Sequence, residues 1–100
     1  MRSVYKYVIP KVECVVSVPM IRDAQVIHVH EQNGDICLWA LVELSRTAFE
    51  HRVFYIRGSG HSVEDDLVYL GTAHIGPYIW HVFESIVRAS YGTSRRMKGT

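Results

Sequence analysis

The sequence predicts an all-β fold, an antiparallel sandwich or partly closed barrel of about seven strands. Apolar and polar residues alternate with a period of two along most of the chain, and the alternating segments are rich in Val, Ile, Tyr, Phe and Trp. Helical periodicity occurs only near the C-terminus, so a mostly β fold with one short C-terminal helix stays open. The predicted strands cover 4–9, 11–18, 25–31, 36–43, 51–57, 67–74 and 78–83.

Three prolines separate several of these segments. Pro10, Pro19 and Pro77 all fall between predicted strands, where a residue without an N–H does least damage to a hydrogen-bonded ladder. Their placement supports this division into strands.

A hairpin around Asn33 and Gly34 is the clearest local feature, because both residues accept the positive φ of a type I′ turn. The turn sets the register, in which the successive pairs are Gln32–Asp35, Glu31–Ile36, His30–Cys37, Val29–Leu38, His28–Trp39 and Ile27–Ala40. Segment 36–42 is apolar on both faces and 25–31 alternates, so the second strand is predicted to be central. One core is predicted to contain Ile27, Val29, Leu38, Ala40, Phe54 and Ile56.

Length and charge favour a single domain over 1–91 followed by a basic tail over 92–100. The chain has 100 residues and 48% apolar content, enough for one core. Segment 84–91 suits two turns of helix. Residues 1–84 hold seven Lys or Arg and ten Asp or Glu, whereas 85–100 hold no acidic residue and the four basic ones Arg88, Arg95, Arg96 and Lys98.

Targeting signals and cysteine usage favour a cytosolic protein. No apolar run approaches the roughly 18 residues of a membrane span, and tyrosines interrupt the N-terminal segment where a signal peptide would be apolar. Cys14 and Cys37 are therefore expected to be reduced thiols.

A candidate metal site follows from the predicted register, which places His28, His30 and Cys37 on one sheet face with donor types that suit Zn²⁺. The HxH pair is similar to one that cupin barrels use, although the second cupin motif is absent. Ordinary cross-strand packing is the competing interpretation, and no metal is expected.

The preferred ligand site is the glycine-rich connection after the fifth strand. Its N–H groups can form an anion-binding nest with a guanidinium, a hydroxyl and an imidazole around it. The predicted ligand-binding residues are Arg57, Gly58, Ser59, Gly60 and His61.

Catalysis has no strong candidate. A triad of Ser59, His61 and Asp65 or Asp66 lacks a nucleophile elbow. No catalytic residue and no cofactor are therefore expected.

A secondary contact surface is predicted on exposed imidazole and aromatic groups, namely His28, His30, Trp39, Trp80 and His81. Aromatic residues and the basic tail also raise nucleic-acid binding, but the acidic body disfavours it.

Five segments read together resemble a family of short bacteriophage and prophage proteins with a domain of unknown function: VYKYVI, NGDICLWALVE, HRVFYIRGSGHSV, VYLGTAHIG and YIWHVFE. The resemblance covers roughly residues 4–84. It implies a phage accessory protein in the host bacterial cytoplasm and brings no reaction, cofactor or catalytic residue. The family pattern has GTGH where this chain has GSGH, so Ser59 keeps a hydroxyl. The resemblance draws attention to Trp39, Gly58, Gly60, His61, Gly71, Trp80 and His81.

We therefore expect a non-catalytic accessory protein that modulates a host process, such as a host-defence antagonist that masks a host protein or sequesters a nucleotide-like ligand. The alternatives are a metal-dependent, cupin-like enzyme built on His28, His30 and Cys37, and a minor structural or assembly protein of the virion. No membrane partner is expected, and a homo-oligomer stays open.

Overall fold

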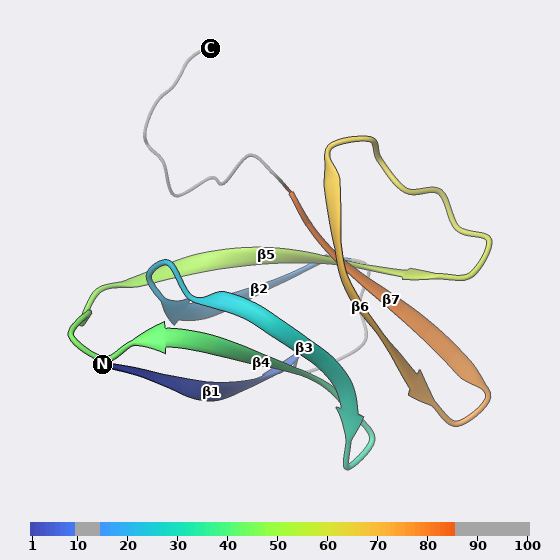
Figure 1. Cartoon of the computed structure of the whole chain (residues 1–100). Coiled ribbons are helices and arrows are strands. Elements are labelled where there is room, and N and C mark those ends of the chain that lie inside the picture. The colour runs from blue at the N-terminus through green and yellow to red at the C-terminus, as the bar shows by residue number, and fades with distance from the viewer. Residues whose placement is uncertain (10–14, 86–100) are drawn as a thin grey trace.

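The structure is a computed structural model that describes residues 1–9 and 15–85 and folds them into seven antiparallel strands (Figure 1). The described residues contain no helix, and hence none that crosses a membrane. The all-β prediction is confirmed. The strands are β1 (Arg2–Ile9), β2 (Val15–Ile21), β3 (Gln25–Gln32), β4 (Asp35–Glu43), β5 (Phe49–Gly58), β6 (Leu67–Ile75) and β7 (Tyr78–Ser85).

The strands form two sheets that face each other without closing into a barrel. The three-stranded sheet has the order β1-β4-β3, and the four-stranded sheet has the order β2-β5-β7-β6. Strand β3 packs against β6, and β1 approaches β2, so the two sheets come together along both pairs of edges. As predicted, β4 is central. Strand β3 lies at an edge of the same sheet.

The Asn33–Gly34 hairpin has the predicted turn and most of the predicted register. Both turn residues have positive φ, 55° and 83°. Cα partners follow the prediction from Gln32 and Asp35 as far as His28 and Trp39.

The prediction for Ile27 is wrong. A β-bulge between Val26 and His28 gives β3 one extra residue, so Val26 and not Ile27 pairs with Ala40. The side chain of Ile27 is 50% exposed instead of buried.

The prediction that Pro19 separates two strands is also wrong, since Pro19 lies inside β2 and pairs with His51. Strand β2 is an edge strand, and an edge tolerates proline because the missing N–H can face away from the ladder. At the other end of the chain, Glu84 and Ser85 belong to β7 and not to the predicted helix. Residues 86–91 of that helix, the tail 92–100, and residues 11–14 of the second predicted strand lie outside the described residues.

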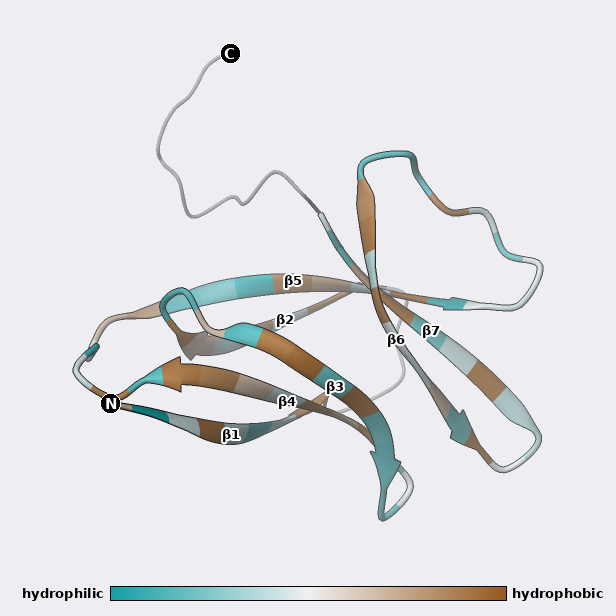
Figure 2. Ribbon diagram, in the orientation of Figure 1, coloured by the Kyte–Doolittle hydropathy of each residue, from teal (hydrophilic) through white to brown (hydrophobic). Residues whose placement is uncertain are grey.

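The core lies between the two sheets and takes one face of each strand. Apolar residues concentrate in the strands, and β4 is apolar over most of its length (Figure 2). The five other members of the predicted core are buried, as predicted. The buried apolar side chains are Ile9, Val18, Met20, Ile21, Ala24, Val29, Ile36, Leu38, Ala40, Val42, Phe54, Ile56, Ala73 and Val82.

A glycine sets the spacing where β6 packs against β3. A Cβ atom at Gly71 would lie 2.6 Å from the Cβ of Val29, closer than real Cβ atoms approach. Only glycine therefore allows the two strands this separation.

A charged group is buried between β2, β5 and β7. The Arg52 guanidinium is bonded to both oxygens of the Glu84 carboxylate and donates to the carbonyl of Ala24 at 2.8 Å. Glu50 lies 3.6 Å from the same guanidinium and accepts a hydrogen bond from the N–H of Asp23 at 2.9 Å. These partners satisfy charges that would otherwise be costly to bury.

Candidate functional site

The glycine turn (residues 58–61) closes on itself directly after β5. The His61 N–H donates to the Gly58 carbonyl at 3.1 Å, and the Gly58 N–H donates to Nδ1 of the His61 ring, also at 3.1 Å. Gly60 has a φ of 89°, which glycine adopts without strain. A Cβ at Gly58 would lie 3.1 Å from the His61 ring, so glycine leaves the space in which that ring sits.

The Arg57 guanidinium is hydrogen-bonded to residues of the loop that follows β5. Its Nε donates to the Ser62 carbonyl at 3.0 Å, and its Nη2 donates to the two Glu64 carboxylate oxygens at 3.0 and 3.2 Å. A hydrogen bond from the Glu64 backbone N–H, and then the Arg57 guanidinium, hold the pKa of the Glu64 carboxyl below its ordinary value. Arg57 therefore holds the loop after β5 in place through contacts that a bound anion would have to displace.

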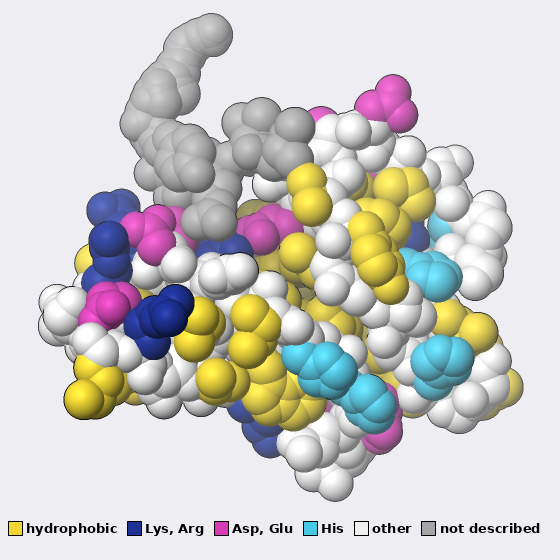
Figure 3. Space-filling view, in the orientation of Figure 1, with side chains coloured by type: hydrophobic (Ala, Val, Ile, Leu, Met, Phe, Trp, Pro, Cys, Tyr) yellow, Lys and Arg dark blue, Asp and Glu magenta, His cyan; other side chains and the backbone are white. Residues whose placement is uncertain are grey.

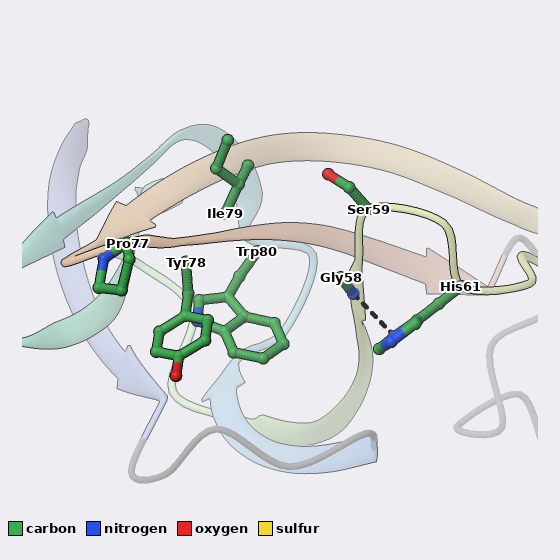
Figure 4. A pocket seen from close by; sticks show the side chains of 7 residues that line it. All are labelled: Gly58, Ser59, His61, Pro77, Tyr78, Ile79 and Trp80. Carbon is green, nitrogen blue, oxygen red and sulfur yellow. Dashed lines mark hydrogen bonds between the residues drawn. The ribbon is translucent and has the colours of Figure 1, made fainter.

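A cleft of about 410 Å³ opens between the glycine turn and the start of β7. Gly58 lies opposite Trp80 in the β5–β7 ladder, and the space that a Gly58 side chain would need is occupied by the His61 ring, so His61 and Trp80 both line the cleft. Tyr78 and Trp80 are two residues apart on one strand, so they share a face, with ring centroids 6.0 Å apart and planes inclined by 28°. The cleft is lined by Gly58, Ser59, His61, Pro77, Tyr78, Ile79 and Trp80 (Figure 4).

The lining side chains point to two sides of the β-ribbon. Tyr78, Trp80 and His61 lie on one side, whereas Ser59 and Ile79 point to the other (Figure 4). The aromatic rings and the imidazole therefore form the floor and wall of the cleft, and Ser59 lies at its rim.

A chain of polar side chains fixes Ser59 to the far side of β7. The Ser59 hydroxyl lies 3.1 Å from Nε2 of His81, whose Nδ1 lies 3.1 Å from the Thr72 hydroxyl. The Tyr69 hydroxyl lies 2.5 Å from that of Thr72. The sequence interpretation of a Ser59–His61–Asp triad is not supported, because Ser59 contacts His81 and the His61 Nδ1 faces the Gly58 N–H.

The predicted secondary surface divides into separate parts. His28, His30 and Trp39 lie together on the outer face of the three-stranded sheet, with the His28 and His30 rings stacked at 5.7 Å and the His28 and Trp39 rings 5.5 Å apart. Histidine and hydrophobic side chains lie side by side over β3 and β4 in Figure 3. Trp80 and His81 are on β7 in the other sheet, where successive residues face opposite sides.

The candidate ligands His28, His30 and Cys37 do not form a metal site among the described residues. Cys37 is a free thiol that is only 1% exposed, and burial raises the pKa of that thiol, which disfavours the thiolate that binds metals. Residues 1–9 and 15–85 contain no group of three His, Cys, Asp or Glu side chains placed to hold a metal ion. The cupin-like interpretation of His28, His30 and Cys37 therefore loses its structural basis.

Sequence reasoning did not assign Pro77, Tyr78 and Ile79 to the ligand site. The relevant signal was the period-two spacing of Tyr78 and Trp80 directly after a Gly-Pro turn, which places two aromatic rings on one face at the end of a hairpin. That this end meets the glycine turn depends on the pairing of β5 with β7.

Comparison with known proteins identifies one family. Residues 1–92 match the family described as a domain of unknown function, DUF7352. Neither a curated protein nor a solved structure matches the chain. The chain belongs to the DUF7352 family.

Proposed function

We propose that this protein is a non-catalytic binding protein that sequesters a nucleotide-like ligand in the cleft between the glycine turn and Trp80. The observation that carries the proposal is the pair of aromatic rings, the exposed Tyr78 and the half-buried Trp80, that line the cleft beside the glycine turn. Planar bases stack on such rings, and each stacked base contributes about 1–3 kcal/mol.

The size and the walls of the cleft support a small ligand. Its volume of about 410 Å³ falls within the range of about 300–1,000 Å³ that is usual for small-molecule sites. The glycine turn is internally hydrogen-bonded and tied to β7 through Ser59 and His81, so one wall is largely pre-formed. Pre-formed walls reduce the entropy lost when a ligand binds.

The biological setting that we propose follows from the resemblance to phage and prophage proteins. A phage accessory protein acting in the host bacterial cytoplasm could remove a nucleotide-like signal on which a host defence depends. Sequestration requires binding alone, which agrees with the lack of any catalytic motif in the sequence.

Tryptophan fluorescence tests this proposal directly. The chain has two tryptophans, so a Trp39→Phe variant reports on Trp80 alone. Titration with nucleosides and nucleotides is expected to quench Trp80 saturably, and Tyr78→Ala is expected to weaken binding by about tenfold or more.

Phe49→Ala is the matched control, because Phe49 is 64% exposed and Tyr78 61%, yet Phe49 begins β5 and does not line the cleft. Binding should survive that change. If no nucleoside or nucleotide changes the fluorescence at millimolar concentration, ligand sequestration is refuted.

A second function, masking of a host protein, is favoured by the outer face of the three-stranded sheet. Val4, Val8 and Ile27 are 49%, 41% and 50% exposed there, next to the partly buried Trp39. Apolar surface of this kind is typical of protein contacts. Capture of a host protein that is lost on Ile27→Asp, with nucleotide binding unchanged, would support masking; recovery of the chain in purified virions would instead indicate a virion component.

A further inference from the structure

We infer that the cleft recognises the planar ring of its ligand and leaves any phosphate in solvent. The inference rests on the proposed binding function and reverses the expectation that the glycine turn captures an anion. It follows from where the hydrogen-bond donors of the turn are directed.

The groups best suited to hold a phosphate already have partners within the protein. Arg57 donates to Glu64 and to the Ser62 carbonyl. The Gly58 N–H donates to the His61 ring, and the Ser59 hydroxyl is hydrogen-bonded to His81. A phosphate would have to break these contacts before it gained any of its own.

The charge around the cleft also disfavours phosphate recognition. Among residues 1–9 and 15–85, the seven that line the cleft include no Lys or Arg, so this part of the lining offers no fixed cation. A neighbouring hollow of about 450 Å³ shares His61 and is lined by Arg57 and the Glu64 carboxylate as well. Since that carboxylate neutralises Arg57, the hollow supplies no net positive charge to an anion.

What the cleft does offer suits a heteroaromatic ring. Tyr78 and Trp80 provide the stacking surface. Because the His61 Nδ1 accepts the Gly58 N–H, neutral His61 carries its proton on Nε2 and is a donor there. A ring nitrogen or ring carbonyl can accept from that donor, whereas a ring without acceptors cannot. A nucleobase has both the plane and the acceptors.

A ligand series separates ring recognition from phosphate recognition. Dissociation constants are measured on the Trp39→Phe protein for adenosine, guanosine, cytidine and uridine, for their mono- and triphosphates, and for ribose 5-phosphate and pyrophosphate. At least one nucleoside is expected to bind within about threefold of its own nucleotides, with little change between about 50 and 500 mM salt. Ribose 5-phosphate and pyrophosphate should neither bind nor compete.

Two variants test the assigned contacts. His61→Phe keeps a ring but removes the donor, and is expected to weaken nucleoside binding by about fivefold or more. Tyr78→Ala should weaken nucleoside and nucleotide alike, because both would use the same ring contact.

The outcomes distinguish ring recognition from the binding function itself. Affinity that rises tenfold or more with added phosphates, or competition by pyrophosphate, would overturn ring recognition while leaving the binding function intact. Absence of binding by the whole series would instead refute the binding function itself.

Discussion

Replacing Gly71 by alanine is expected to destabilise the fold by about 1–3 kcal/mol, the usual cost of overpacking a core. The added Cβ would lie 2.6 Å from the Cβ and 2.8 Å from the Cγ2 of Val29. Carbon atoms in contact normally lie about 3.5–4.0 Å apart, so β3 and β6 must separate by about 1 Å or more. In a domain of this size the melting temperature should fall by about 4–8 °C for each kcal/mol.

Urea unfolding followed by circular dichroism measures this effect, and the Val29 background tests its cause. Val29→Ala removes Cγ2 but keeps Cβ, so most of the cost of Gly71→Ala should persist in that background. Val29→Gly removes both atoms and should reduce the cost. If Gly71→Ala changes the free energy of unfolding by less than about 0.5 kcal/mol, the two strands do not pack as described.

Three further outcomes are expected. The pKa of Glu64 is lowered in the folded chain, so its carboxylate stabilises the fold above the ordinary value of 4.5, and this contribution disappears as the pH falls through the lower folded value. Glu64→Gln should therefore lower the melting temperature at about pH 6 and have little effect at about pH 2. An equal effect at both pH values would contradict the assignment. Arg52→Met leaves the Glu50 and Glu84 carboxylates buried without their guanidinium, so it should lower the free energy of unfolding in urea by about 3–5 kcal/mol. An unchanged free energy of unfolding would show that these charged side chains are in contact with solvent. Burial raises the pKa of the Cys37 thiol, so in a Cys14→Ser variant a thiol reagent should label it only slowly until urea is added; rapid labelling of the folded protein would show that the thiol is accessible.

Local sequence rules predicted the strands because their causes are local. The alternation along β3 and β5 and the positive φ accepted by Asn33 and Gly34 both act over a few residues. The same rules misplaced Ile27, because a bulge that adds one residue to β3 leaves no distinct signal in a run of β-branched residues. They misplaced Pro19 because a proline at an edge strand has the same sequence appearance as a proline between strands.

The candidate site was only partly predictable, because its contacts join segments far apart in the chain. The glycine turn was identified from its two glycines. The hydrogen bonds of Arg57, however, depend on the folded positions of Glu64 and the Ser62 carbonyl. The cleft exists because β5 pairs with β7, which sets Gly58 opposite Trp80. Alternation predicted which face of each strand is buried, but it did not predict which strands are neighbours.

The most direct test of the central claim is a ¹H–¹⁵N NMR titration of the full chain with the nucleoside that binds best in the ligand series. The indole N–H of Trp80 and the backbone amides of Gly58 and Gly60 are expected to shift together and saturate, because these residues line or bound the cleft. The indole N–H of Trp39, on the outer face of the other sheet, should stay in place. Shifts confined to Trp39 and its neighbours His28 and His30, or no shifts at saturating nucleoside, would contradict the account.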